Sequence, residues 1–185
     1  MKQKQGIQTG LFGEWLSNYL HHKPKYAQYT VYYDHGDKKK NHNVVSIKGI
    51  LGGKLCRQNT LAEVDVMVTS PNNEIITIIE IEERPSTPKK IIGDIMTLAL
   101  CNRFYIKQNG EPQDFKITHD TRLVVAGITP PEGSNLPQLC NIIPRLKRFT
   151  SPDDGINLQN LNYIFREDIN TTLEALKKYM QEIFP

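Results

Sequence analysis

Cysteine is scarce in this sequence. Cys56, Cys101 and Cys140 are the only three among 185 residues, and no two of them form a CxxC pair. An odd number of cysteines without that spacing indicates neither a disulfide framework nor a zinc cluster. The expectation is a set of reduced thiols in a cytoplasmic protein.

Long hydrophobic runs are also lacking. No apolar stretch approaches the length of a membrane span, and the first residues, 1–6, are not followed by the apolar core of a signal peptide. A hydrophobic content of 38% over this length is sufficient for one ordinary globular core. We therefore expect one domain over residues 1–185, located in the cytoplasm and without a membrane partner.

Positive charge is missing from one part of the chain. Residues 61–83 contain six Asp/Glu and no Lys or Arg, whereas residues 1–60 contain ten Lys/Arg and three Asp/Glu. The net charge of +3 therefore hides an acidic segment within a basic frame. Basic surroundings suit a polyanionic partner, and a concentrated acidic cluster suits a metal ion.

The acidic segment predicts a β-hairpin. Polar and apolar residues alternate on both sides of a turn at 70–73. If Asn72 and Asn73 form the turn, Asp65 lies opposite Glu80, and Glu63 lies opposite Glu82.

Four carboxylates then share one face of this hairpin. Like charges across a strand pair are destabilising, and neighbouring carboxylates resist ionising together unless a positive charge lies among them. A bound divalent cation resolves this conflict. The alternative is an exposed, charged strand end that prevents edge-to-edge aggregation.

The remaining periodicity predicts helices and strands that alternate along the chain. A helix over 86–105 is favoured by Pro88 near its start, and Gly93 is expected to permit close packing of that helix. This order predicts an α/β fold with a mixed central sheet flanked by helices. The other expected elements are helices at 10–22, 136–149 (interrupted at Pro144) and 168–184, strands at 29–33, 43–51, 121–129 and 157–165, and a loop or short hairpin at 106–120.

Three charged side chains outside the hairpin are further candidates. Glu14 lies beside the apolar stripe of the first helix, where its carboxylate either reaches a site covered by the helix or is solvated. Lys89 and Lys90 fall in the first turn of the helix after the hairpin, where the helix dipole disfavours cations. Two lysines there hint at a nearby anion or carboxylate.

Basic residues before the hairpin are candidate contacts to nucleic acid. A run formed by Lys38, Lys39 and Lys40 follows a tyrosine-rich strand, and Lys54 and Arg57 lead into the hairpin. Such side chains bind phosphate groups. They also occur in ordinary solvated loops, and both interpretations remain open.

One motif in the hairpin resembles a known family. Asp65 is followed after fourteen residues by Glu80-Ile81-Glu82 at the end of a hydrophobic strand, and a helix comes next. This pattern resembles the PD-(D/E)XK, or restriction-endonuclease-like, nuclease superfamily. The resemblance covers about residues 10–128 through topology and this short motif, and it implies an αβββαβ core with a helix–strand–helix extension at 135–185.

The resemblance implies roles for the acidic residues. Asp65 and Glu80 match the two ligands of Mg²⁺, and Glu14 matches the acidic residue that many members carry on the opening helix. Glu63 is an additional carboxylate that the motif does not require, and it is a further candidate metal ligand.

The third position of the motif departs from the family pattern. Glu82 stands where most members have lysine, although some restriction enzymes of the superfamily also have Glu there. Glu82 is a candidate to ligate a second metal ion or to orient water. Lys89 or Lys90 then replaces the motif lysine from the following helix.

The function expected from these observations is hydrolysis of phosphodiester bonds. A few carboxylates, with water and phosphate oxygens, form the kind of site that Mg²⁺ prefers, and such a site activates water for attack at phosphorus. We expect a Mg²⁺-dependent deoxyribonuclease, for which Mn²⁺ is a substitute, and an endonuclease of restriction or repair type rather than an exonuclease. DNA is the expected partner and RNA the alternative one; a homodimer is common among endonucleases that cut both strands.

Two other interpretations remain open. The first is a catalytically degenerate nuclease-like domain that binds nucleic acid or a protein. The second is an unrelated α/β protein in which the acidic hairpin is only part of the surface.

Overall fold

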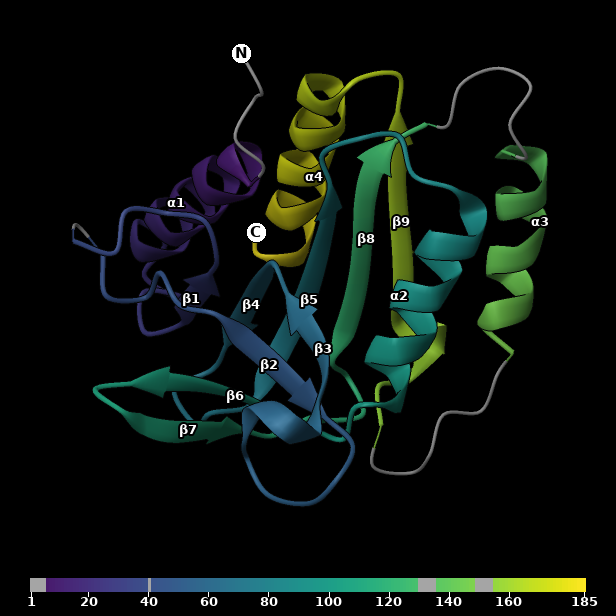
Figure 1. Ribbon diagram of the computed structural model, residues 1–185. Coiled ribbons are helices and arrows are strands. Elements are labelled where there is room, and N and C mark those ends of the chain that lie inside the picture. The colour runs from purple at the N-terminus through teal and green to yellow at the C-terminus, as the bar shows by residue number, and fades with distance from the viewer. Residues whose placement is uncertain (1–5, 40, 130–135, 149–154) are drawn as a thin grey trace, which may run out of the picture.

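The computed structural model describes residues 6–39, 41–129, 136–148 and 155–185. It confirms a mixed α/β architecture (Figure 1). The helices are α1 (Ile7–His21), α2 (Pro88–Leu100), α3 (Leu136–Leu146) and α4 (Ile169–Ile183). The strands are β1 (Thr30–Tyr33), β2 (Ile47–Ile50), β3 (Thr60–Val64), β4 (Val66–Thr69), β5 (Ile75–Glu82), β6 (Arg103–Gln108), β7 (Glu111–Phe115), β8 (Arg122–Ile128) and β9 (Leu161–Arg166).

The strands form two sheets. The central sheet is mixed and has the order β1-β4-β5-β8-β9, in which β4 is antiparallel to β1 and β5, and β8 is parallel to β5 and β9. The second sheet has the order β3-β2-β6-β7 and is antiparallel throughout. It lies at one end of the central sheet, beside α2 (Figure 1).

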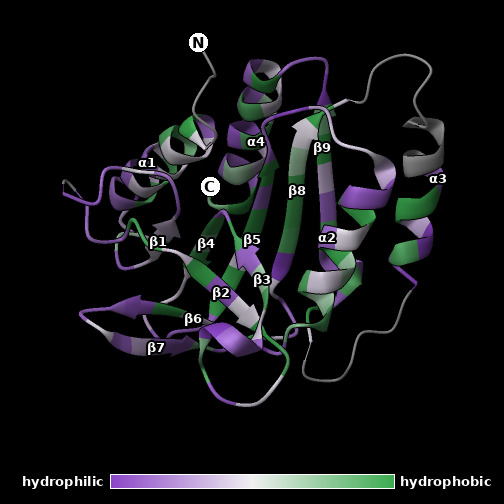
Figure 2. Cartoon of the chain, viewed as in Figure 1, coloured by the Kyte–Doolittle hydropathy of each residue, from purple (hydrophilic) through white to green (hydrophobic). Residues whose placement is uncertain are grey.

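Helices cover both faces of the central sheet. One hydrophobic cluster joins α1 and α4 to the face that carries Val66, Val68 and Ile79. The other joins α2, α3 and the second sheet to the opposite face, which carries Met67 and Ile78. Hydrophobic residues accordingly dominate β8 and much of β5, whereas β7 is mostly hydrophilic (Figure 2).

Local sequence signals fix the starts of two of these helices. The Asp168 carboxylate accepts hydrogen bonds from the backbone N–H groups of Asn170 and Thr171 and so caps α4. The Thr87 hydroxyl accepts from Lys90 N and caps α2, whose first residue is Pro88. These caps satisfy N–H groups that have no partner within the helix.

The acidic hairpin has the predicted register over its central part. Val66, Met67 and Val68 pair with Ile79, Ile78 and Thr77, and the register shifts by one residue at Thr69, which pairs with Ile75. The connection spans residues 70–74 rather than two residues, and Ser70 N donates to Glu74 O. A bulge compensates for the longer turn, so the expected pairing survives.

The predicted pairing of Glu63 with Glu82 was wrong. The chain bends at Asp65, so that β3 leaves the hairpin and joins the second sheet. Glu63 therefore lies opposite Lys48 on β2, and their side chains form an ion pair. The like charges are separated because the two strands diverge at the bend.

Other boundaries also differ from the prediction. Helix α2 ends at Leu100 rather than near residue 105, because Phe104 and Ile106 pack into the core from β6. Strands β6 and β7 form a hairpin through Asn109 and Gly110, both with positive φ. Helix α3 continues through Pro144 to Leu146.

The role expected for Gly93 was also wrong. A Cβ atom built at this position meets no described atom within 4 Å, so the glycine does not permit a close contact. Within the described part of the chain, no helix has the length and apolar character needed to cross a membrane.

Candidate functional site

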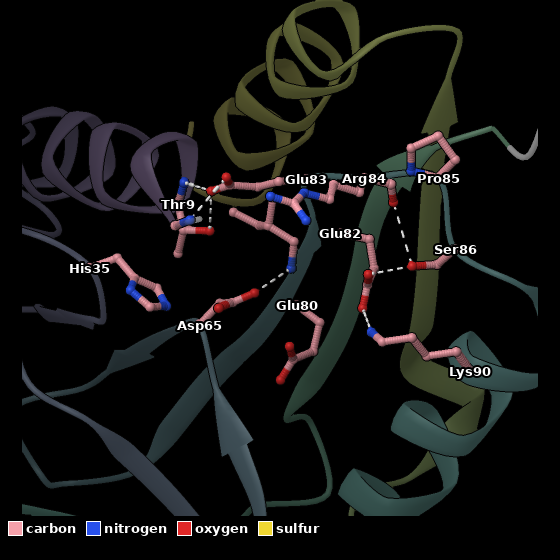
Figure 3. A pocket seen from close by; sticks show the side chains of 12 residues that line it. Thr9, His35, Asp65, Glu80, Glu82, Glu83, Arg84, Pro85, Ser86 and Lys90 are labelled. Carbon is pink, nitrogen blue, oxygen red and sulfur yellow. Dashed lines mark hydrogen bonds and ion pairs between the residues drawn. The ribbon is translucent and has the colours of Figure 1, made fainter. Parts of the chain in front are cut away.

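A cavity of about 390 Å³ lies at the carboxyl end of β5 (Figure 3). It is bounded by the bend between β3 and β4, the start of α1, the segment between β5 and α2, and the first turn of α2. Its charged and polar lining comes from residues far apart in the sequence: Thr9, His35, Asp65, Glu80, Glu82, Glu83, Arg84, Ser86 and Lys90.

Asp65 projects into the cavity from the bend itself. Its Oδ2 accepts a hydrogen bond of 2.8 Å from Ile81 N, and its carbonyl oxygen accepts one of 2.9 Å from Asp34 N. Burial raises the pKa of the Asp65 carboxyl to about 6. The bend and this hydrogen bond thus hold a carboxylate in place at the edge of the cavity.

Glu80 belongs to β5, and its side chain lies next to that of Asp65 (Figure 3). The residue is half-buried, but its Oε1 atom is fully buried and has no hydrogen-bond partner among the described residues. Burial, followed by the negative charges of Asp65 and Asp94, raises the pKa of Glu80 well above its ordinary value. A buried carboxylate oxygen without a partner is costly, so this position needs a ligand or a proton.

Glu82 is held by two partners. Its Oε2 accepts a hydrogen bond of 2.5 Å from Ser86 Oγ, and its Oε1 forms an ion pair with Lys90 Nζ. Lys90 Nζ also donates to Asp94 Oδ2 at 3.1 Å. Although partial burial lowers the pKa of Lys90, its bonds to Glu82 and Asp94 raise it overall.

The carboxylate of Glu83, which follows β5, lies at the N-terminus of α1. Its Oε1 accepts from Thr9 N at 2.8 Å and from the Thr9 hydroxyl at 3.0 Å, and its Oε2 accepts from Gly6 N at 3.0 Å. Helix N-termini favour negative charge and have unpaired N–H groups. Glu83 therefore joins α1 to the end of β5 and defines one wall of the cavity.

Two basic residues of the cavity were missed by sequence reasoning. His35, with a φ of 63°, belongs to the loop after β1, and the four histidines of residues 21–42 have no recognised ligand spacing. Arg84 follows the acidic segment directly and is exposed at the cavity. Only the fold brings His35 to the carboxylates, whereas Arg84 directly follows Glu82 and Glu83 in the sequence.

Two other acidic candidates lie outside this cavity. Glu14 is exposed on α1, where its charge acts on Tyr33. Glu63 lines a neighbouring cavity of about 240 Å³ between β3 and α2, together with Glu80 and Asp94. Glu80 therefore separates the two cavities, and Asp94 is a carboxylate near it that the motif did not indicate.

The basic candidates are distributed over other surfaces. Lys89 is exposed beside Lys90, and Lys54 is exposed in the loop after β2. Lys38 and Arg57 line a third cavity, Lys39 is exposed, and Lys40 lies outside the described residues.

Neither of the two described thiols, Cys56 and Cys101, lines the cavity. Cys101 is buried, and burial raises the pKa of its thiol to about 12. The side chain of Cys140 lies outside the described part of the chain.

No protein-family model, curated protein or solved structure matches this chain.

The residues fit a divalent cation that binds mainly through oxygen. Within the described ranges, no three His, Cys, Asp or Glu side chains form a ready-made metal cage. Mg²⁺ does not need one, because it keeps several waters and commonly uses one or two carboxylates with phosphate oxygens from the substrate. Asp65 and the unpaired Oε1 of Glu80 offer such a pair.

Proposed function

We propose that this chain is a metal-dependent nuclease that hydrolyses phosphodiester bonds of DNA, and that it acts as an endonuclease. The observation that carries the proposal is the buried, unpartnered Oε1 of Glu80 beside the carboxylate of Asp65, within a polar cavity. Two adjacent carboxylates with raised pKa values are poorly stabilised by the protein alone. A cation between them relieves this repulsion.

In this proposal, Asp65 and Glu80 hold Mg²⁺, or Mn²⁺ as a substitute. When bound, the cation supplies an activated water and neutralises charge on the phosphate. The hydrogen bond from Ile81 N fixes the Asp65 carboxylate, so that its orientation does not change during the reaction. Exposed Arg84 is in a position to contact a phosphate oxygen at the cavity mouth.

Lys90 is the proposed substitute for the motif lysine. It reaches the cavity from the first turn of α2 and contacts Glu82, the residue that stands at the motif position. Lys89 is exposed, and the cavity lining does not include it. In this proposal Lys90 stabilises negative charge on the phosphate, while Glu82 and Asp94 hold its ammonium group in place.

The order of elements is consistent with the proposed restriction-endonuclease-like core. Within the central sheet, α1 is followed by three antiparallel strands, β1, β4 and β5, and then by α2 and the parallel strand β8. This is the αβββαβ order that the motif implies. Strands β2 and β3 and the β6–β7 hairpin are insertions into that core.

A second candidate is a domain that binds nucleic acid without cleaving it. The observation that favours this alternative is the pairing of Lys90 with both Glu82 and Asp94, which leaves less of its charge for a phosphate. Such a domain binds DNA but releases no cleavage product with any divalent cation.

The test is a cleavage assay with Mg²⁺ or Mn²⁺ on plasmid DNA, linear duplex DNA and single-stranded oligonucleotides. We expect the wild type to cleave, and Asp65→Ala and Glu80→Ala to lower the rate by at least about 100-fold because they remove metal ligands. Lys90→Ala should also lower the rate, whereas its exposed neighbour, Lys89→Ala, should not. Equal cleavage by wild type and Glu80→Ala would indicate a contaminating nuclease and contradict the proposal.

A further inference from the structure

A cavity of about 400 Å³ lies on the outer face of the second sheet. Lys48 of β2 pairs directly with Tyr105 of β6, so their side chains share one face, and Lys107 lies two residues further along β6 on the same face. Ile47 and Phe104 point the other way, into the core. The loop between β1 and β2 and the short turn before β3 close the cavity with Lys38 and Arg57.

The lining is strongly basic. Lys38, Arg57 and Lys107 are exposed and form no ion pair with any described residue, whereas Lys48 is paired with Glu63. Among the residues that the structure describes, the cavity thus has three cations without an ion-pair partner, Lys38, Arg57 and Lys107, and a fourth, Lys48, that is partly neutralised. Like charges at this density favour an anionic ligand.

The remaining lining is mostly apolar, with Ser46 as its polar member. Of the apolar residues Val44, Val45 and Tyr105, Val45 is half-buried, whereas Val44 and Tyr105 are buried. A cavity with several cations around an apolar wall suits a ligand that has both a phosphate and a flat, weakly polar group. A nucleotide has this chemistry, whereas an inorganic anion uses only the charged part.

One ion pair and a shared lining residue relate this basic cavity to the acidic one. Lys48 lines the basic cavity and forms an ion pair with Glu63. Glu63 lines the intermediate cavity together with Glu80, and Glu80 also lines the cavity of Asp65.

We propose that the basic cavity binds a nucleotide of an unpaired strand, with its phosphate between Arg57 and Lys107 and its base against the apolar part of the lining, where Val45 is the most exposed residue. This inference rests on the proposed function in that the bound strand continues to the Asp65 and Glu80 site. A duplex keeps its bases stacked inside and presents only phosphate to such a cavity. The cavity therefore gives the protein a preference for single-stranded segments or frayed ends.

The test is binding of a fluorescent single-stranded oligothymidylate, measured by anisotropy with a chelator present so that hydrolysis does not interfere. We expect Arg57→Ala and Lys107→Ala each to weaken binding by about 3- to 10-fold and to reduce its salt dependence by about one phosphate contact. Lys178→Ala, at an exposed lysine of α4, is the matched control and should bind like the wild type. Circular dichroism confirms that the variants are folded.

Competition experiments distinguish a nucleotide from a simple anion. Thymidine monophosphate should displace the oligonucleotide at lower concentration than inorganic phosphate, because only the nucleotide uses the apolar wall. If thymidine monophosphate displaces the oligonucleotide at a concentration below that of the oligonucleotide itself, the natural ligand is a free nucleotide. This result would still support a nucleotide site. Equal displacement by inorganic phosphate would overturn the proposal.

Two further results would overturn the inference. One is unchanged binding in both Arg57→Ala and Lys107→Ala, and the other is equally tight binding of a duplex of the same length. The outcome is independent of catalysis: the expected binding pattern without cleavage would refute the nuclease function alone. Cleavage with unchanged binding in these variants would refute the cavity alone.

Discussion

The carboxylates of the acidic segment differ because each has a different partner. Asp65 accepts a backbone hydrogen bond, Glu82 is paired with Lys90, and Glu83 caps a helix. Glu80 has a buried oxygen without a described partner. Some of these negative charges therefore serve to stabilise the fold. Of the four carboxylates, those of Asp65 and Glu80 remain available for a cation.

The raised pKa of Asp65 predicts a pH dependence of stability. Its pKa rises from 3.8 in the unfolded chain to about 6 in the folded protein because of burial. At low pH, Asp65 is protonated in both the folded and the unfolded state. As the pH rises from about 4 to about 6, Asp65 loses its proton first in the unfolded state, and the native state therefore becomes less stable. Since a difference of about two pKa units corresponds to about 3 kcal/mol, the free energy of unfolding should fall by up to that amount.

This prediction is checked by urea unfolding at several pH values in a buffer with a chelator. Asp65→Asn should remove the part of the decline that Asp65 causes, because an amide does not ionise, whereas the raised pKa of Glu80 leaves a decline in both proteins. Asp120→Asn, at an exposed position, should leave the decline unchanged. A wild-type protein that gains stability between about pH 4 and about pH 6 relative to Asp65→Asn would disprove the burial account.

At the scale of elements, the start of α1 depends on residues distant in sequence. Gly6 is its N-cap residue and has no side chain to cap the helix, so Glu83 supplies the acceptor. Loop residues also approach α1 closely: a Cβ at Gly10 would lie 2.4 Å from His35 O. The glycines of α1, which weaken an isolated helix, allow the loop carrying His35 to reach the cavity.

Glu83→Ala should destabilise the protein. It removes the carboxylate that caps α1, and the loss of a cap and of a favourable helix-dipole interaction costs about 1–2 kcal/mol. Chemical denaturation measures this change. Glu14→Ala, at an exposed position on the same helix, should change stability by less than about 0.5 kcal/mol, and an equal effect of both substitutions would argue against a cap.

Glycine to alanine substitutions in two helices should have opposite effects. Gly13→Ala would place a Cβ 2.3 Å from Tyr33 Cγ, and the resulting overpacking should cost about 1–3 kcal/mol. Gly93→Ala on α2 meets open space and should stabilise the protein by about 0.5–1 kcal/mol through helix propensity. Thermal unfolding compares the two, and destabilisation by Gly93→Ala would show that α2 packs more closely at this position.

The sequence allowed the hairpin to be predicted but not its division between two sheets. Alternation fixes which residues share a face, so the register of Val66 with Ile79 followed from the pattern. The same alternation runs unbroken through Val64, Asp65 and Val66, and therefore gives no sign that the chain bends there. Asp65 and Glu80 were placed together correctly because the hairpin pairing holds up to the bend at Asp65. Glu63 was misplaced because it precedes the bend and belongs to the second sheet.

The start of the β6–β7 hairpin was misplaced for a related reason, because the preceding helix was expected to continue to about residue 105. Phe104, Tyr105 and Ile106 form a short apolar run that follows a helical pattern, and a run of this length is compatible with either structure. Packing against β2 decides the outcome. The contributions of His35, Arg84 and Glu83 to the cavity depend on these tertiary contacts.

At the scale of the whole molecule, the acidic and basic segments of the sequence line two different cavities. The acidic cavity lies at the end of β5, and the basic cavity lies on the outer face of the second sheet. The Lys48–Glu63 ion pair stands between them. A polyanion is attracted to the basic side, whereas the carboxylates on the acidic side repel it unless a cation offsets their charge.

The most direct test of the central claim is the binding of Mn²⁺, measured by titration calorimetry on the protein without nucleic acid. We predict saturable binding to the wild type and to Glu182→Gln, an exposed control, and a loss of affinity by more than about tenfold in Asp65→Asn and Glu80→Gln. Wild-type protein that binds no Mn²⁺, or variants that bind it as tightly as the wild type, would contradict the assignment of Asp65 and Glu80 as the metal ligands of a nuclease.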